Sequence, residues 1–484
     1  MLIICPDPTY TYECEKICRV FFPTERFEVR TGADPGGEGV AAAITQAGET
    51  LTFSCRASLG GRTAEKSETA EAAALRISRE MALARVILLA LGELTGVMPP
   101  WGVLTGVRPS KLMRSLIRRH GEQTAREIFE RDLMVRPDKA ALALSVAKAE
   151  DAGVALSSPA SFSLYVSIPF CPTRCAYCSF VSHSIASAKK LIPDYVRRTA
   201  EELAYTGAIA RELGLRLETV YFGGGTPTSL SAEDLTALTD AVRSSFDLSA
   251  VREFTVEAGR PDTVDEGKLR ALKNAGVTRI SINPQTFNDR VLEAIGRRHT
   301  AAETIEKFRL ARSLGFDNIN MALIAGLTDD TPESFRESVS TALALAPENI
   351  TVHTLALKTA ARLVTENART ESAAATAEMV ETANRLLSGG GYAPYYMYRQ
   401  SKSLGNLENV GWTRPGFDCL YNIYMMEEIH TVLAVGAGAV TKLKDPRSEA
   451  LTRVYNFKYP YEYISRFDEM LARKDEVRAF YSRI

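Results

Sequence analysis

The sequence lacks several features that would assign a protein class directly. Its 484 residues carry a formal net charge of −1, so neither sign of charge attracts it to nucleic acid or to a membrane. The most apolar helical stretch, Val86–Leu91, is far too short to span a bilayer. The first ten residues, MLIICPDPTY, do not have the basic segment and apolar run of a secretory leader. We therefore expect a cytoplasmic protein without a membrane span.

Cysteine is scarce as well, and three of the eight cysteines lie together in the segment 164–180, LYVSIPFCPTRCAYCSF. Cys171, Cys175 and Cys178 have the spacing C-x3-C-x2-C, and only His183 lies nearby as a fourth ligand for a structural zinc ion. A disulfide framework is not expected in a long chain of this composition. Three thiolates on one loop favour an iron–sulfur cluster, because a fourth would close it and three leave one iron open.

The other cysteines do not form such a motif. Cys5, Cys14 and Cys18 lie close in the sequence and raise the alternative of a second metal site. Cysteine is common in protein cores, where it behaves as a small apolar residue, so we expect buried thiols instead.

Short strand-like runs alternate with helical segments between residues 161 and 388, which predicts a parallel sheet of the α/β class. Six such units predict a partial (β/α)6 barrel, whose chemistry gathers at the carboxyl ends of the strands. We expect an N-terminal α+β domain over residues 1–155 and a C-terminal α+β domain over residues 389–484. The expected strands are Leu164–Ile168, Thr219–Phe222, Phe254–Glu257, Arg279–Asn283, Asn318–Ile324 and Ile350–His353.

Polar or glycine-rich motifs follow several of these strands. The triplet Gly223–Gly225 would let backbone groups approach a ligand closely, because no side chain intervenes. Glu257 and Gln285 end the next two strands and suit the hydroxyl and amino groups of a polar ligand. Each residue alone has a plain structural interpretation, but together on successive units they favour a ligand site. The segment GRRHT adds Arg297, Arg298 and His299, and arginine binds carboxylates through its planar fork.

These residues carry a family resemblance. The segments IPFCPTRCAYCSF, GGGTPTSL, TVEAGRPDT, SINPQTFND and GRRHT resemble the oxygen-independent coproporphyrinogen III dehydrogenase (oxidase) family of radical S-adenosylmethionine (SAM) enzymes. TGVRPSK and GNLENVGW resemble its Firmicutes-type variant subgroup. The resemblance implies a TIM-like partial barrel of the radical SAM type, one 4Fe-4S cluster and SAM. It also implies decarboxylation of two propionate side chains to vinyl groups, giving protoporphyrinogen IX in heme biosynthesis.

The same resemblance implies roles for single residues. Cys171, Cys175 and Cys178 would hold the cluster, and Arg297, Arg298 and His299 would meet carboxylates, with Arg108 as a further candidate. The implied partners are a tetrapyrrole substrate and a low-potential electron donor of the flavodoxin or ferredoxin type. The positions lining the cluster-bound SAM would be Tyr165, Gly224, Glu257 and Val440, and those around a second SAM would be Tyr177, Gly225, Thr226, Gln285, Arg297 and Leu355.

Three departures from the family pattern stand out. Phe180 occupies the place of a further cysteine that is not a cluster ligand. Ala322, in NINMALIAGL, replaces an acidic residue, and Asn320 is the expected substitute because residues two apart on a strand share a face. The stretch NLENVGW lacks the His of the H-N-x-x-Y-W stretch found in heme-chaperone relatives.

Two other functions remain open at this point. One is a heme-binding chaperone related to the family, which the missing His disfavours. The other is a radical SAM enzyme that acts on another tetrapyrrole or on RNA. For RNA the support is a basic helical face, with Lys111, Arg114 and Arg118 at helical spacing, and the near-zero net charge disfavours it.

Overall fold

The computed structural model describes residues 1–179, 183–357, 372–400 and 402–483, so Phe180 lies outside the described residues. The chain forms two compact units. The first contains Met1–Lys148 and Met397–Glu408, and the second contains Ala149–Tyr396 and Asn409–Ile484. Among the described helices, none has both the length and the apolar character needed to cross a membrane.

The first unit contains a five-stranded sheet in the order β2-β1-β3-β4-β5. Along β4, Leu51, Phe53, Cys55 and Ala57 are buried while the residues between them are mostly half exposed, which is the alternation of a sheet covered on one face. The strands are β1 (Leu2–Cys5), β2 (Glu28–Thr31), β3 (Gly39–Ala47), β4 (Thr50–Leu59) and β5 (Arg62–Glu71). The helices are α1 (Thr11–Phe21), α2 (Arg79–Thr95), α3 (Pro109–His120) and α4 (Glu122–Glu127), and α5 (Pro137–Val154) begins in this unit.

The burial of single side chains tests two expectations about this unit, the core thiols and the basic face of α3. Cys5, Cys14 and Cys18 are free and buried, as expected for core thiols. The basic face expected on α3 is interrupted, because Arg114 is only 5% exposed while Arg118 is exposed. Helical spacing gives residues the same face, but it does not say whether that face meets solvent.

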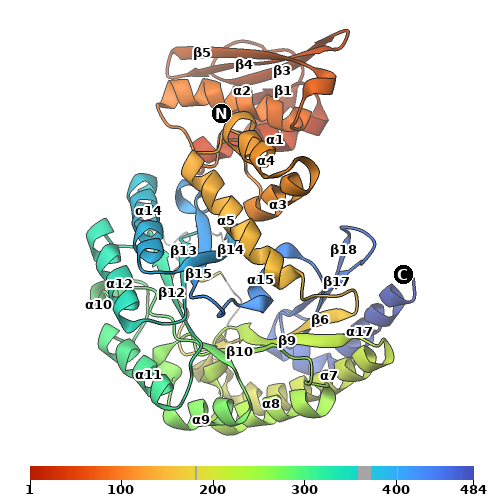
Figure 1. The fold of residues 1–484 in the computed structure, drawn as a ribbon, viewed down its shortest axis with the longest axis vertical. Coiled ribbons are helices and arrows are strands. Elements are labelled where there is room, and N and C mark those ends of the chain that lie inside the picture. The colour runs from red at the N-terminus through yellow and green to blue at the C-terminus, as the bar shows by residue number, and fades with distance from the viewer. Residues whose placement is uncertain (180–182, 358–371, 401, 484) are drawn as a thin grey trace. The chain divides into compact units, whose positions relative to one another are not determined.

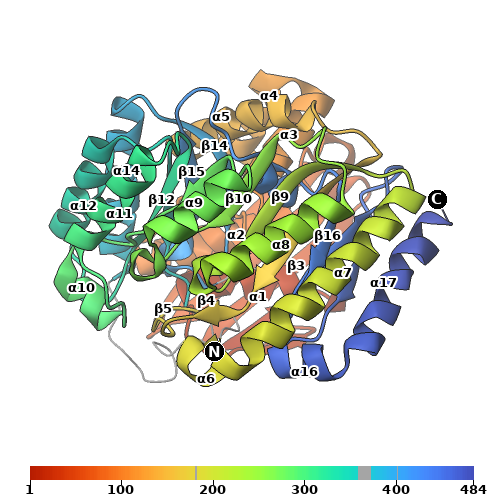
Figure 2. The ribbon, with the colours of Figure 1, turned by 90° about the horizontal axis from the view of Figure 1, so that it is seen from below.

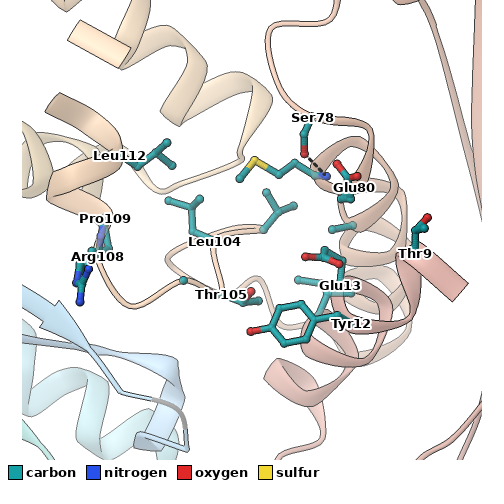
Figure 3. Close-up of a pocket in the computed structure, with 15 residues that line it drawn as sticks. Thr9, Tyr12, Glu13, Ser78, Glu80, Leu104, Thr105, Arg108, Pro109 and Leu112 are labelled. Atoms are coloured by element: carbon teal, nitrogen blue, oxygen red, sulfur yellow. Dashed lines mark hydrogen bonds between the residues drawn. The ribbon is translucent and has the colours of Figure 1, made fainter. Parts of the chain in front are cut away.

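A cavity of about 450 Å³ lies in the first unit where the first turns of α1, α2 and α3 approach one another (Figure 3). Apolar side chains such as Leu104 and Leu112 line it together with Glu13, Glu80 and Arg108. Both carboxylates lie in the first turns of their helices, where a negative charge offsets the helix dipole. Arg108, expected as a further carboxylate-binding residue, therefore belongs to the first unit.

The segment Met397–Glu408 packs within the first unit through buried charges. Lys139 Nζ lies 2.5 Å from Glu408 Oε1, and Trp101 Nε1 donates to Glu408 Oε2 at 2.8 Å. Burial raises the pKa of Glu408, but Lys139 and Trp101 outweigh it and hold the net pKa below its ordinary value. Arg399 donates to the carbonyl oxygen of Leu104. These contacts tie a segment from late in the chain to the first unit.

The main sheet of the second unit has eleven described strands in the order β14-β15-β13-β12-β11-β10-β9-β6-β16-β17-β18, and β7 (Phe170–Cys171) and β8 (His183–Ser184) form a separate pair. The six expected strands are all present as β6, β9, β10, β11, β12 and β13, and successive members pair in parallel. The predicted partial barrel of the α/β class is therefore confirmed. The strands are β6 (Ser161–Ile168), β9 (Arg216–Gly224), β10 (Glu253–Glu257), β11 (Arg279–Ser281), β12 (Ile319–Ala325), β13 (Asn349–Thr354), β14 (Ala393–Arg399), β15 (Glu408–Thr413), β16 (Thr431–Val435), β17 (Val440–Lys444) and β18 (Leu451–Tyr455).

Helices follow the parallel strands and cover the outer face of this sheet, whereas α15 (Leu420–Glu427) lies on its inner side (Figures 1 and 2). Six of the described helices of this unit begin at a side-chain cap that satisfies a free backbone N–H group, at Ser231, Asp265, Asn288, Thr300, Thr331 and Ser372. The other helices of this unit are α6 (Ile185–Ala188), α7 (Ile192–Glu212), α8 (Ala232–Ser245), α9 (Glu266–Asn274), α10 (Asp289–Ala294), α11 (Ala301–Ser313), α12 (Pro332–Leu345), α14 (Ala373–Gly389), α16 (Pro460–Ser465) and α17 (Phe467–Tyr481).

The C-terminal region divides differently from the expected three domains. β16 pairs in parallel with β6, from Thr431 opposite Phe162 to Val435 opposite Val166, and β15 pairs antiparallel with β13. Residues 409–484 therefore complete the barrel sheet on both sides instead of forming a unit of their own. Pairing between strands more than 260 residues apart leaves no local pattern in the sequence.

Candidate functional site

The loop with the three cysteines leaves the carboxyl end of β6 and is held from both sides. Its first cysteine belongs to β7 (Phe170–Cys171), a two-residue strand that pairs with β8 (His183–Ser184). The backbone N–H of Ala176 donates to the carbonyl of Ile295 at 3.0 Å, and Thr173 Oγ1 donates to the carbonyl of Gly296 at 3.1 Å. The loop thus lies against the segment that follows α10, which also carries the GRRHT residues.

Two buried guanidinium groups face the middle cysteine. Arg260 Nη1 donates to Cys175 Sγ at 3.4 Å, and Arg260 is itself paired with Asp262 at 2.9 Å. Burial raises the pKa of the Cys175 thiol, but the charges of Arg297 and Arg260 lower it by more. The net pKa of the thiol is therefore below its ordinary value. This arrangement favours a thiolate, the form of cysteine that binds iron. Sequence reasoning missed Arg260 although the segment FTVEAGRP contains it.

Backbone hydrogen bonds hold the end of the glycine triplet against the start of the cysteine loop. The N–H of Gly225 donates to the carbonyl of Ile168, and that of Thr226 to the carbonyl of Phe170, each at 2.7 Å. A Cβ atom at Gly225 would lie 2.6 Å from Phe170 O, so only glycine fits there. Thr226 Oγ1 lies 3.4 Å from Cys171 Sγ, which brings the end of the triplet to the first cysteine.

Glu257, at the end of β10, shares the inner face of the sheet with a group of aromatic side chains. The Tyr221 hydroxyl donates to Glu257 Oε1 at 2.5 Å. Tyr165, Tyr221 and Tyr421 stack, with 4.3 Å between the ring centroids of Tyr221 and Tyr421. Burial raises the pKa of Glu257 above its ordinary value, and the Tyr221 hydrogen bond and Arg279 only partly offset this. Tyr165 and Glu257, both expected near SAM, therefore lie at one place.

Gln285 has an unusual backbone and an unsatisfied side chain. Its φ is 68°, in the left-handed region that residues other than glycine seldom adopt. Backbone hydrogen bonds on both sides hold it there, from its N–H to Ala322 O and from Ile324 N–H to its carbonyl, each 2.9 Å. Its side chain is 7% exposed, and no described donor reaches Oε1. A strained residue with a free buried acceptor is typical of a ligand site.

Arg297 is buried, while its neighbour Arg298 is exposed. Arg297 donates to Asn283 O at 2.9 Å, to Gly259 O at 3.3 Å and to the Tyr177 hydroxyl at 3.2 Å. Its Nε has no partner within the described chain. The structure thus brings Arg297 to Tyr177 of the cysteine loop, whereas Arg298 is exposed.

His299 is 2% exposed and lies next to Asp262, with 3.8 Å between Nδ1 and Oδ1. This distance is too long for a hydrogen bond. Burial lowers the pKa of His299, although Asp262 opposes the change. Burial raises the pKa of Asp262, but the paired Arg260 guanidinium outweighs it and holds the net pKa well below its ordinary value. Because its pKa is lowered, the His299 side chain is a neutral imidazole at neutral pH.

The remaining expected residues fall on two further strands. Leu355 follows β13 and is buried, with its N–H donating to Ala325 O at 2.9 Å, and Val440 begins β17. Ala322 lies on β12, where its N–H donates to Asn283 Oδ1 at 3.1 Å. Asn320, the expected substitute for an acidic side chain, instead accepts from Thr351 Oγ1 at 2.9 Å. Asn283 is therefore the polar side chain that contacts Ala322.

These residues fit an iron–sulfur cluster with a ligand on its open iron. In the described part of the chain, no three His, Cys, Asp or Glu side chains converge closely enough to hold a single metal ion. Cluster thiolates need not converge in this way, because each binds a different iron. Three cysteines, two cations beside them and the free atoms of Gln285 and Arg297 match the chemistry of such a site.

Comparison with known proteins agrees with this geometry. The model of the radical SAM superfamily matches residues 165–342. The coproporphyrinogen III oxidase (HemN) of Escherichia coli, described as a radical SAM enzyme, has a similar fold, with a TM-score of 0.54 and 23% identity over 67% of this chain and 73% of that one. The chain therefore has the fold of the radical SAM enzymes, whose cofactors are a 4Fe-4S cluster and SAM.

The family follows from a longer match. The chain is 39% identical over 386 residues to the oxygen-independent coproporphyrinogen-III oxidase-like protein HemZ of Bacillus subtilis, covering 78% of this chain and 77% of that protein. It belongs to this family of coproporphyrinogen oxidase-like radical SAM proteins. It is also 41% identical to the heme chaperone HemW of Bacillus subtilis, over 197 residues that make up 40% of this chain and 50% of that protein.

Proposed function

We propose that this protein is a radical SAM oxidoreductase that decarboxylates propionate side chains of coproporphyrinogen III to vinyl groups, giving protoporphyrinogen IX. The single observation that supports it most is the meeting of the cysteine loop, Gln285 and Arg297 at one end of the barrel. The named family suggests the tetrapyrrole substrate. A low-potential donor of the flavodoxin or ferredoxin type would supply the electron.

In this proposal, Cys171, Cys175 and Cys178 hold the cluster, and Arg260 and Arg297 offset the negative charge of the thiolates. When bound, the cluster and SAM supply the radical chemistry that removes a hydrogen atom from a propionate side chain. The backbone of Gly224, which has no side chain, lets SAM approach the sheet closely.

Other residues bind and orient the ligands. Glu257 accepts a hydrogen bond from an adenosyl group, and Tyr165, stacked in the aromatic group, excludes water beside it. Gln285 accepts a hydrogen bond through its free Oε1, and Arg297 donates to a carboxylate of SAM or of the substrate through its free Nε. Val440 and Leu355 line the adenosyl sites, together with Tyr177, Gly225 and Thr226. His299, neutral and buried, lies beside the Asp262–Arg260 pair with both ring nitrogens free for a ligand, since no described residue bonds them.

The test is a reconstitution assay under anaerobic conditions. The protein receives iron, sulfide, SAM, a reductant and coproporphyrinogen III, and the divinyl product is measured by mass spectrometry. We expect product only when cluster and SAM are both present. SAM cleavage without any change to the tetrapyrrole would contradict the assignment of coproporphyrinogen III as the substrate, but it would still support radical SAM chemistry.

The similarity to HemW keeps a heme-binding role as the second candidate. Against it, the stretch Leu407–Trp412 is buried and has Leu407, Glu408 and Gly411 where H-N-x-x-Y-W would provide polar groups. Glu408 is already engaged by Lys139, and a Cβ atom at Gly411 would lie 1.9 Å from the Tyr396 ring. A heme titration followed by absorbance distinguishes the two, because a chaperone would bind heme tightly without converting coproporphyrinogen.

A further inference from the structure

The turn that follows β16 consists of Gly436, Ala437, Gly438 and Ala439, and we name it the GAGA turn. β16 lies beside β6, so this turn meets the backbone at Ser167, three residues before the cysteine loop begins at Phe170. Ser167 Oγ donates to the carbonyl of Ala437 at 2.8 Å. The turn leads directly into Val440, which the proposed function assigns to the SAM site.

Packing of side chains can hold this turn only weakly, because it has none larger than a methyl group. Hydrogen bonds must position it instead. The N–H of Gly436 donates to Glu202 Oε2 at 2.8 Å, and the N–H of Ala437 donates to the Tyr195 hydroxyl at 2.9 Å. A Cβ atom at Gly436 would lie 2.5 Å from Ser167 O, so the turn sits as close to β6 as a backbone permits.

Glu202, on α7, is the centre of this set of bonds. It is fully buried and accepts four donors, two on each oxygen. Beside Gly436, Oε2 accepts from the Tyr463 hydroxyl at 2.6 Å, and Oε1 accepts from Lys474 at 2.9 Å and from Asn456 at 2.8 Å. The same Asn456 amide donates to Gly436 O at 2.8 Å. One carboxylate therefore joins α7, α16 and α17 to the turn.

We propose that Glu202 is a positioning residue that fixes the GAGA turn, and with it the SAM-site wall at Val440, at a set distance from the cysteine loop. The inference rests on the proposed function in one respect, because Val440 is taken to line the SAM site. Glu202 is fully buried, and the four donors that it accepts all belong to the protein. It acts by holding a backbone turn whose small residues leave room for a ligand and make few packing contacts of their own.

The test uses the full chain with and without a reconstituted cluster. Glu202→Gln removes the charge, and E202Q/K474M removes it together with the buried lysine charge it would leave unpaired. We expect both variants to raise the dissociation constant of SAM about tenfold or more, because a displaced binding wall is costly. In the cluster-free protein, hydrogen exchange at 436–440 should become faster than in the wild type.

A matched control is Glu218→Gln, at the opposite end of the same sheet. Glu218 is equally buried and accepts from Arg216, Arg252 and Ser161, so its loss also removes a buried carboxylate. Exchange at 436–440 and SAM affinity should both stay at the wild-type level in this variant.

The outcomes are distinct. Wild-type exchange at 436–440 in E202Q/K474M would overturn the proposal, and so would fast exchange there with unchanged SAM affinity. Global loss of protection in both variants would also overturn it, because Glu202 would then serve folding in general. If the wild-type protein binds no SAM, the proposed function fails, and the exchange measurement alone decides whether Glu202 holds the turn.

Discussion

At the amino end of the barrel sheet, Glu218 accepts hydrogen bonds on both carboxylate oxygens, whereas at the carboxyl end the buried Oε1 of Gln285 has no partner in the described residues. His430 at the amino end contacts Ser157 and Ser163 at 2.8 Å each, while both ring nitrogens of His299 at the carboxyl end lack a hydrogen bond within the described chain. Leaving a buried polar group unpaired costs about 1–3 kcal/mol. Among these four side chains, the two at the amino end are satisfied within the fold, and the two at the carboxyl end keep atoms free for a ligand.

The largest effect should come from Cys175→Ala at the carboxyl end. A cluster held by two thiolates is labile, so iron binding and SAM cleavage should both be lost. The iron content and the absorbance of the reconstituted protein measure this. Cys419→Ala, which removes a buried thiol that donates to Glu253, is the control and should retain its iron. A complete four-iron spectrum in the Cys175 variant would falsify the assignment.

The next effect concerns His430 and the pH dependence of stability. Burial lowers its pKa from the ordinary 6.5 to about 4. Between these values the unfolded chain binds a proton that the folded chain does not, so stability falls as the pH drops from about 6.5 to 4. The loss for this one group is on the order of 3 kcal/mol.

Urea unfolding at several pH values measures that loss, and in His430→Asn the slope between pH 6.5 and pH 4 should be smaller. An equal slope in the variant and the wild type would show that His430 does not cause the loss of stability at low pH. SAM affinity should not change, because His430 lies at the end of the sheet away from the cysteine loop.

Arg297→Ala should weaken binding of SAM or of porphyrinogen about ten- to a hundredfold, since charge-assisted hydrogen bonds contribute roughly 1.5–3 kcal/mol each. Equilibrium binding to the reconstituted protein measures it. Arg298→Ala is the matched control, because its side chain is exposed one residue away. Equal effects of the two variants would show that burial does not distinguish their roles.

Glu218→Gln should lower the free energy of unfolding by about 1–2 kcal/mol, a modest amount because Arg216 and Arg252 are nearly half exposed. Its SAM affinity should match the wild type. A change in affinity with unchanged stability would reverse the comparison between the two ends.

The smallest effect is expected for Ala322→Asp. The new carboxylate would lie beside Asn283, which already accepts the hydrogen bond from the Ala322 N–H. If position 322 faces the ligand, the binding free energy of SAM should differ between the variant and the wild type by about 1 kcal/mol or less, because Asn283 already supplies a polar group there. Ala322→Ser, which adds a polar group without charge, separates charge from size. No change in either variant would show that position 322 does not face the ligand.

The barrel was predictable because its information is local. Each of the six strands is a short segment with several β-branched or other apolar residues, and each is followed within a few residues by glycine or by polar residues. The cluster cysteines were readable for the same reason, since their spacing lies within eight residues. Local patterns therefore predicted the fold class and the centre of the site.

The rest depends on contacts between distant segments. The contact of Arg260 with Cys175 joins loops 85 residues apart, and the contact of Asn283 with Ala322 follows from the register of β11 and β12. The burial of Arg114 likewise follows from packing, not from helical spacing. The expected C-terminal domain assumed that adjacent residues fold together, whereas β16 pairs with a strand more than 260 residues earlier.

The tight fit at Gly411 also restricts the order in which this stretch can change. The Tyr396 ring fills the space that any side chain at position 411 would need. A protein of this kind could therefore acquire an aromatic residue before Trp412 only after Tyr396 had become small. The reverse order would pass through a chain with two overlapping side chains. Of the two possible orders of substitution, the one that begins at Tyr396 is therefore open, and the one that begins at Gly411 is blocked.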